Sequence, residues 1–345
     1  MTFEPKKKLR IIVLVHEDFV PPDSLDGLSD KERLAVKTEF DVISTLRKMG
    51  HEVYPIGLYN QLNVIGNALM EYKPHVAFNL LEEFHGYPLY DQHVVSYLEL
   101  MKQAYTGCNP RGLTLAHDKA LTKMILAYHR LLVPNFAVFP LNRKVHRPKR
   151  LKFPLLVKSI SEEGSVGIAQ ASIVHDDDKL TQRVEFIHRQ NKTAAIAEQY
   201  IRGREIYVGL VGNQNIQTYT PWELVMEKLP EGTENIATLK VKWDPNYQQK
   251  VGVGTRAADL SSEQHKTLER LSKRIYRYLF LSGYARLDYR MTEEGQFYLL
   301  EANPNPQIAA GEDFAESAAY AGVPYDQLLQ KIITIGLNYQ GGQPT

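Results

Sequence analysis

The sequence has a single cysteine, Cys108, among its 345 residues. One cysteine excludes an intramolecular disulfide framework and a metal site built from several thiolates. An excess of charge of one sign is also missing, because 41 Lys and Arg residues face 40 Asp and Glu residues, which leaves a formal net charge of +1. This balance argues against a generic binder of nucleic acid, which would carry a marked basic excess.

Long apolar runs are absent as well. No stretch reaches the roughly 18 apolar residues expected of a membrane-spanning helix. The apolar run at residues 11–15 is shorter than the core of a secretory signal and is followed by acidic residues. We therefore expect a cytoplasmic protein that does not bind a membrane, with enough chain for two or three structural units.

The first third of the chain alternates strands with helices. Strands are predicted at residues 9–15, 51–58 and 75–80, with helices at 31–50, 62–74 and 91–104. This order predicts a parallel sheet with helices on its faces. Ligands of such sheets lie beyond the carboxyl ends of the strands, where residues 16–23 and 79–86 follow the first and third strands.

The remaining two thirds mix helices with strand pairs. Helices are predicted at residues 111–132, 176–190, 261–281, 312–322 and 324–337, and strands at 135–140, 153–159, 193–201, 204–213, 284–291 and 296–304. Residues 236–260 are predicted to form one long loop. No sequence repeat or low-complexity tract is evident.

Four polar side chains alternate along the last two predicted strands. Arg286 and Asp288 are two residues apart on one strand, and Glu301 and Asn303 are two apart on the other. Side chains at i and i+2 share one face of a strand, so a hairpin would bring all four together. Two carboxylates and an amide oxygen are hard ligands that suit Mg²⁺. The alternative is an exposed polar face on which Arg286 pairs with an acid.

Two lysines stand in contexts that suit phosphate. Lys158 ends an apolar strand and precedes a loop that contains Gly164, Ser165 and Gly167, whose backbone N–H groups would cover a polyphosphate. Lys119 lies on the helix predicted at 111–132. The alternative is that both lysines are ordinary solvated side chains. A GxxxxGK[ST] motif is missing, so this is not a P-loop protein.

Polar residues also lie at the end of the strand predicted at residues 193–201. Glu198, Gln199 and Ile201 would present backbone groups to an adenine edge, and Glu205, beyond a turn, would bind a ribose. The alternative is a plain strand-turn-strand with surface acids.

These motifs, in this order, resemble the ATP-grasp superfamily, and most closely the D-alanine–D-alanine ligases. The resemblance runs from about Tyr105 to Leu337, through residues 117–123, 154–169, 198–208, 284–306 and 321–332. It implies an α/β chain with the ATP-grasp fold. An N-terminal Rossmann-like domain would span residues 1–110, and two α+β subdomains, 111–198 and 199–340, would sandwich ATP. Residues 236–260 would be a lid.

The family pattern implies roles for matching positions. The positions that would contact ATP are Lys119, Lys158, Ser165, Glu198, Gln199, Ile201, Glu205 and Leu300. The two lysines would bind phosphates and Leu300 would pack on the adenine. Asp288, Glu301 and Asn303 would bind two Mg²⁺ ions, with Mn²⁺ as an alternative. Arg286 would stabilise the tetrahedral intermediate, and Lys242 would reach the terminal phosphate.

The departures from the family fall at the substrate positions. The N-terminal segment that holds the first substrate's ammonium is replaced by residues 16–23, a supporting Ser aligns with Gly164, and a lid Tyr aligns with Trp243. The Ser that holds the second substrate's carboxylate aligns with Glu312, and Gln307 lies in the altered segment before it. An acid there predicts an amine substrate that lacks an α-carboxylate in the usual pose or carries a positive group. The alternative is that Glu312 simply favours a helix N-terminus.

Two further candidates lie at the carboxyl edge of the predicted parallel sheet. Glu17 and His85 would contact the carboxylic substrate, although polar loop residues need no such role.

The predicted activity is therefore an ADP-forming carboxylate–amine ligase that works through an acyl phosphate. It would join an amino acid to another amino acid or to a small carboxylic metabolite. The alternatives are a genuine D-alanine–D-alanine ligase, an ATP-grasp small-molecule kinase and an ATP-binding regulatory protein. The partners would be small molecules and, as is usual in this family, a second copy of the chain.

Overall fold

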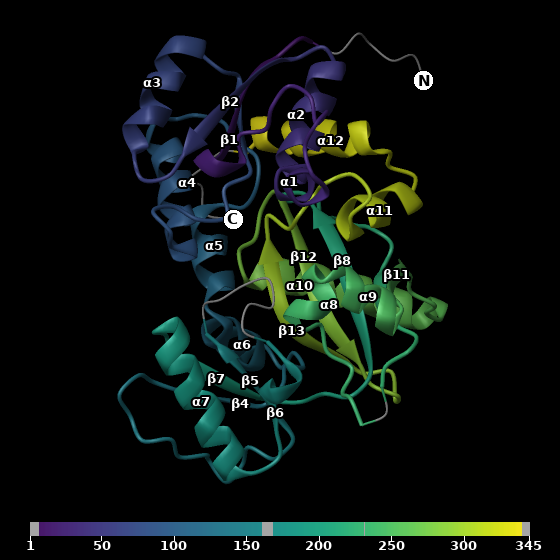
Figure 1. Ribbon diagram of the computed structural model, residues 1–345. Helices are drawn as coiled ribbons and strands as arrows, with labels where there is room; N and C mark the ends of the chain where they lie inside the picture. The colour runs from purple at the N-terminus through teal and green to yellow at the C-terminus, as the bar shows by residue number, and fades with distance from the viewer. Residues whose placement is uncertain (1–6, 161–167, 231, 340–345) are drawn as a thin grey trace.

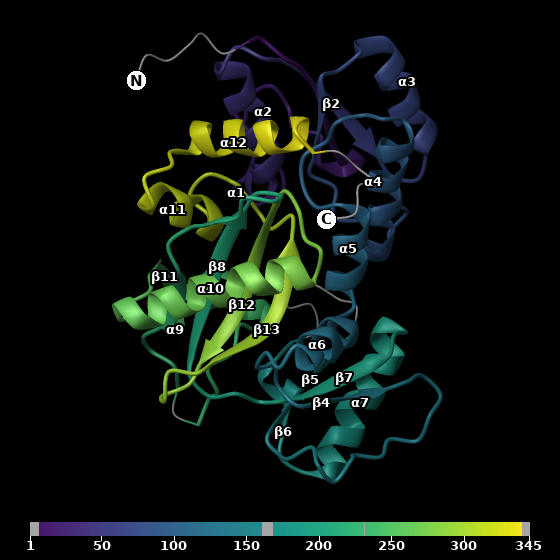
Figure 2. The ribbon, with the colours of Figure 1, turned by 180° about the vertical axis from the view of Figure 1, so that it is seen from behind.

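The computed structural model describes residues 7–160, 168–230 and 232–339, apart from the side chains of residues 242, 243 and 245. Within these residues the chain forms three sheets, one after another (Figure 1), and the view from behind shows the helices that cover them (Figure 2). No described helix is both long and apolar enough to pass through a membrane.

The first sheet is parallel, as predicted, with the strand order β2-β1-β3. Its strands are β1 Arg10–His16, β2 Glu52–Leu58 and β3 Val76–Asn79, and its helices are α1 Asp30–Ala35, α2 Lys37–Lys48, α3 Leu62–Tyr72 and α4 Asp91–Leu100. The predicted single helix over 31–50 is wrong, because the backbone leaves the helical region at Val36 (φ −110°, ψ 13°). The break lets α2 bury its apolar face while α1 buries no residue.

The second sheet is antiparallel, with the order β4-β7-β5-β6. Its strands are β4 Phe136–Phe139, β5 Leu155–Ser159, β6 Ile173–Val174 and β7 Ala195–Gln199, and the helices of this part are α5 Pro110–His117, α6 Lys119–Tyr128 and α7 Asp177–Asn191. The predicted single helix over 111–132 is also wrong. Asp118 is extended and its carboxylate accepts hydrogen bonds from the N–H groups of Ala120 and Leu121, which starts a new helix at Lys119.

The third sheet has the order β11-β10-β8-β12-β13, with β9 paired to β8. Its strands are β8 Arg204–Val211, β9 Gln217–Thr218, β10 Trp222–Met226, β11 Val253–Ala257, β12 Tyr284–Met291 and β13 Phe297–Pro304. The helix α10 Ser262–Tyr278 covers one face and begins with a capping box formed by Ser261 and Gln264.

The predicted long loop over 236–260 is wrong. It contains α8 Leu239–Trp243, α9 Pro245–Val251 and β11, which pairs with β10. Side-chain caps from Thr238 and Asp244 start the two helices, and Val241 packs on Tyr207 and Trp222 of the sheet. This segment therefore has its own core contacts on the face opposite α10.

The last two helices return to the first sheet. α11 Asp313–Tyr320 is followed by α12 Tyr325–Leu337, which lies beside α2 (Figure 1) and also contacts β3. Leu328 and Ile332 of α12 share one buried cluster with Val13 of β1 and Val42 of α2. The limits 1–110, 111–198 and 199–340 remain predictions, and the first sheet takes part of its core from the end of the chain.

Candidate functional site

The hairpin of β12 and β13 carries the most polar face of the third sheet. Its antiparallel pairing is confirmed, with Arg286 opposite Asn303 and Asp288 opposite Glu301. Arg286 donates to both oxygens of the Asp288 carboxylate, at 2.8 and 3.0 Å, and Asn303 donates to the same carboxylate at 3.0 Å. The four side chains therefore lie on one face, and three of them, Arg286, Asp288 and Asn303, are joined by hydrogen bonds.

A bulge interrupts this ladder at Leu300. Asp288 pairs with Glu301 but Tyr289 pairs with Leu299, so Leu300 has no partner in the ladder. Leu300 and Glu301 are both partly exposed, which breaks the alternation of burial along β13. Bulges commonly redirect side chains beside functional sites, and this one turns two neighbouring residues towards the polar face.

Lysines from the central part of the chain meet this face. Lys119 of α6 lies 2.8 Å from Glu301. Lys158, at the end of β5, pairs with Glu198 of β7 at 3.3 Å. The structure therefore brings the two lysines predicted to bind phosphate onto carboxylates, and both lysines are buried.

Lys123 is a member of this group that the sequence analysis missed. It donates to the carbonyl oxygen of Leu300 at 2.8 Å and pairs with Glu198 at 2.9 Å. Lys123 lies four residues after Lys119 on α6, so helical spacing was the available signal. Glu198 therefore lies between two lysines, and its carboxylate faces them.

Burial and charge oppose each other in this group. Burial disfavours ionisation of Glu198, but Lys123 and Lys158 outweigh it and hold the pKa of Glu198 below its ordinary value. Burial lowers the pKa of Lys123. Burial also acts on Lys158, but Glu198, Glu301 and Asp288 outweigh it and raise the pKa of Lys158. The site therefore holds its charges by mutual pairing rather than by contact with water.

Glu205 lies on β8 beside the same face. Arg290 pairs with it at 2.7 Å, and the hydroxyl of Tyr207 donates to it at 2.8 Å. Arg290 also donates to the carbonyl oxygens of Gly203 and Asn235, so it fixes both the carboxylate and the turn before β8. Sequence reasoning did not single out Arg290 or Tyr207.

The two other residues predicted at the adenine lie near the end of β7. Gln199 is half-buried and its side-chain oxygen accepts a hydrogen bond from Asn135 at 3.2 Å. Ile201 is buried.

The candidate substrate residues form two further groups. His16 lies 3.5 Å from Glu83, so the loops after β1 and β3 meet at the predicted edge of the first sheet. Glu17, beside His16, belongs to a short 3₁₀ helix at residues 17–19. His85 has a positive φ of 58° and its ring stacks on that of Tyr59.

The second group is the loop after β13. Gln307 contacts Thr38, and the N–H of Ala310 donates to Asp41 at 3.1 Å, so α2 holds this loop. Glu312 is the N-cap residue of α11 but makes no side-chain capping hydrogen bond. Burial raises the pKa of Glu312, and Lys37 partly opposes that rise.

Five predicted positions lie wholly or partly outside the described residues. Ser165 and its neighbours Gly164 and Gly167 lie outside the described residues, as do the side chains of Lys242 and Trp243. The backbone of residues 242 and 243 belongs to α8, which covers the polar face of the third sheet.

The oxygen atoms on the hairpin fit a hard cation. The described residues contain no group of three or more Asp, Glu, His or Cys side chains placed to hold a metal ion. Asp288, Glu301 and Asn303 nevertheless supply two carboxylates and an amide on one face, the donor types that Mg²⁺ prefers. Arg286 and Lys119 now neutralise these carboxylates.

Comparisons with known proteins agree with this architecture. Residues 126–334 match the family model described as the D-ala D-ala ligase C-terminus. An uncharacterized protein, y4sG of Sinorhizobium fredii, is 30% identical over 75% of this chain and 74% of its own length. A D-alanine–D-alanine ligase of Aquifex aeolicus is 27% identical over 90% of this chain and 98% of its own. The crystal structure of the Bacillus anthracis D-alanine–D-alanine ligase complexed with ATP superposes with a TM-score of 0.74 at 24% identity, covering 95% of this chain and 97% of that one.

Proposed function

This chain belongs to the D-alanine–D-alanine ligase family of ATP-grasp ligases, and we propose that it joins a carboxylate to an amine by way of an acyl phosphate, releasing ADP. The observation that carries this proposal is the shared face of Arg286, Asp288, Glu301 and Asn303, with Lys119 in contact with Glu301. A carboxylate is a poor acyl donor because its leaving group would be oxide. Phosphorylation by ATP supplies a good leaving group, which an amine then displaces.

The roles follow from charge and position. Lys119 and Lys158 would bind the phosphates of ATP, and Lys123 would hold Glu198 and the bulge at Leu300 in place. Asp288, Glu301 and Asn303 would hold Mg²⁺, which when bound neutralises charge on the transferring phosphoryl group. The nucleotide contacts and the homodimer remain predictions.

Arg286 would stabilise the oxyanion that develops when the amine attacks. It is partly buried, and its guanidinium lies over the ring of Tyr207 with 4.7 Å between the guanidinium carbon and the ring centre. Burial opposes its charge, but Asp288 outweighs burial and raises the pKa of Arg286, so Arg286 stays cationic. A fixed cation in a site shielded from water stabilises developing charge more strongly than one in solvent.

We propose that the amine substrate lacks a free α-carboxylate at the N-terminus of α11, or that it carries a positive group there. Glu312 and Asp313 stand at that N-terminus, and Asp41 adds a third carboxylate nearby. Lys37 is the cation in this group, and it already pairs with Asp41 at 2.8 Å. The net negative charge would repel a substrate carboxylate and attract an ammonium.

The test is ADP release over a panel of amino acids, diamines and carboxylic acids, with mass spectrometry of the products. An amide product supports the ligase, and a stable phosphorylated product would identify a kinase instead. Tight ATP binding without turnover would identify a regulatory protein. Efficient synthesis of D-alanyl-D-alanine would refute the proposed substrate class while leaving the ligase intact.

Arg286→Ala tests the assigned chemistry. We expect amide formation to fall about 100- to 1000-fold, as for the loss of one oxyanion donor, while ATP binding is retained. Arg286→Lys is the matched control, because it keeps the charge but loses the planar pair of donors that Asp288 accepts. Full turnover in Arg286→Ala would refute the role.

A further inference from the structure

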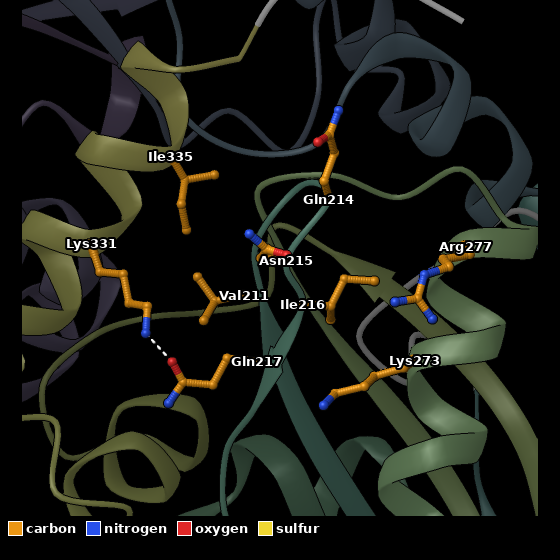
Figure 3. Close-up of a pocket in the computed structure, with 9 residues that line it drawn as sticks. All are labelled: Val211, Gln214, Asn215, Ile216, Gln217, Lys273, Arg277, Lys331 and Ile335. Carbon is orange, nitrogen blue, oxygen red and sulfur yellow. Dashed lines mark hydrogen bonds between the residues drawn. The ribbon is translucent and has the colours of Figure 1, made fainter. Parts of the chain in front are cut away.

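A hollow of about 470 Å³ lies between α10, α12 and the turn after β8 (Figure 3). Lys331 reaches it from α12, and Lys273 and Arg277 reach it from α10 on the other side. The hollow lies on the opposite side of the third sheet from the candidate site. Tyr289 hydrogen-bonds Ser272 of α10, whereas its neighbour Asp288 points to the other face.

The charge around this hollow is unbalanced. Its lining has three cations and no carboxylate. Lys273 pairs with Glu269 at 2.6 Å, outside the lining, whereas Lys331 contacts the neutral side chain of Gln217. In the described part of the chain, Arg277 and Lys331 form no ion pair with an acid. Burial alone lowers the pKa of Lys331, and no anion offsets it.

The wall of the hollow is held in place by the surrounding elements. The hydroxyl of Tyr276 donates to the carbonyl oxygen of Gly212 at 2.8 Å. The side chain of Asn213 accepts from the N–H of Gly283, just before β12, and donates to the carbonyl oxygen of Ile335 on α12. Gly212 has a φ of +135°, and a Cβ there would lie 2.2 Å from the carbonyl oxygen of Asn215. The turn therefore requires glycine, and the hollow has a preformed wall.

We propose that this hollow binds a small polyanion through Arg277 and Lys331, at a site separate from that of the ligase reaction. Carboxylate or phosphate groups would supply the charge that the lining lacks, and Asn215 and Gln217 offer amide groups to the rest of the ligand. The volume is in the range of pockets that bind small molecules.

The basic outer face of α10 would attract an anionic ligand towards this hollow. A smaller hollow of about 270 Å³ adjoins the first one, and its lining adds the cations Lys266, Arg270 and Arg274 and one acid, Glu269. These residues continue the basic row along α10 at helical spacing, so the surface beside the hollow attracts anions.

The test is calorimetric titration of the full chain with citrate and, separately, with pyrophosphate. Arg277→Gln and Lys331→Gln are each expected to weaken binding about tenfold or more, the usual effect of losing a charged hydrogen bond. Lys266→Gln is the matched control on the same helix but outside the larger hollow, and Lys158→Gln is the control in the proposed ATP site. Lys266→Gln should bind both probes within about twofold of the unaltered chain, and Lys158→Gln should bind citrate within about twofold. A preference for citrate would indicate carboxylate ligands, and a preference for pyrophosphate would indicate phosphate ligands.

Three results would overturn the proposal. Loss of binding in Lys158→Gln alone would place the anion in the ATP site. Equal small losses in all variants, Lys266→Gln included, would indicate a diffuse basic surface of the kind that binds nucleic acid. Failure of the unaltered chain to bind either probe at millimolar concentration would exclude the site. Arg277→Gln, Lys331→Gln and Lys266→Gln alter side chains that are exposed or partly exposed, so unchanged melting temperatures in these variants would show that the fold is retained.

Discussion

Replacing Glu198 by glutamine is expected to destabilise the protein strongly. Glu198 is 2% exposed and lies between Lys123 and Lys158, which are 1% and 7% exposed. The amide has nearly the same shape but no charge, so the substitution leaves two buried ammonium groups without their common anion. Removing one partner of a buried pair costs about 3–5 kcal/mol in the free energy of unfolding.

Urea unfolding of the variant and the unaltered chain would measure this cost. Glu185→Gln is the matched control, because Glu185 is 53% exposed and lies 3.7 Å from Arg189. Its loss is expected to cost no more than about 0.5 kcal/mol. Adding Lys123→Met to Glu198→Gln should restore part of the stability, since one unpaired ammonium is removed.

The pH dependence gives a second measurement of the same group. The folded pKa of Glu198 is lowered, so its contribution to stability is present above the unfolded value of 4.5 and is lost as the pH falls through the folded pKa. A Glu198→Gln variant as stable as Glu185→Gln would refute the idea that this carboxylate holds the two lysines.

Three further predictions concern other parts of the molecule. Burial raises the pKa of Glu39 from 4.5 to about 7, so between these pH values the folded chain keeps a proton that the unfolded chain releases. The free energy of unfolding should therefore fall by at most about 3 kcal/mol as the pH rises from 4.5 to about 7. Glu39→Gln should remove this fall when urea unfolding is compared at pH 5 and pH 8, and an unchanged pH dependence would contradict the prediction. Gly203→Ala should lower the free energy of unfolding by about 1–3 kcal/mol, because φ at Gly203 is +141° and a Cβ would lie 2.0 Å from the carbonyl oxygen of Met291. An unchanged thermal melting temperature would show that the turn adapts. Asn303→Ala should raise the Mg²⁺ concentration needed for half-maximal ADP release by about tenfold, and an unaltered Mg²⁺ titration would remove Asn303 from the ligand set.

Local patterns were enough to predict most elements of the fold. The buried run of β1 and the alternating strands and helices after it predicted the parallel sheet, because each signal lies within one element. The breaks at Val36 and Asp118 were missed, since helical periodicity continues across both positions. The segment at 236–260 was predicted as a loop because α8, α9 and β11 are short, and their stability comes from packing on the third sheet.

The candidate site, too, was predicted only in part from local patterns. The spacing of Arg286 with Asp288, and of Glu301 with Asn303, predicted their common face, because side chains alternate along a strand. No local pattern relates Lys123 to Glu198, which is 75 residues away by the numbering and meets it only when α6 packs against β7.

The amino-acid sequence therefore determined the elements and the residue types that mark this chain as an ATP-grasp ligase, because periodicity and motif spacing are local properties. Tertiary structure decided which charges share a partner. It set Glu198 between two buried lysines, and it brought Lys331 to the same hollow as Arg277. Such pairings depend on packing between segments that are distant in the chain. Burial there raises the free-energy cost of any charge that is left without a partner.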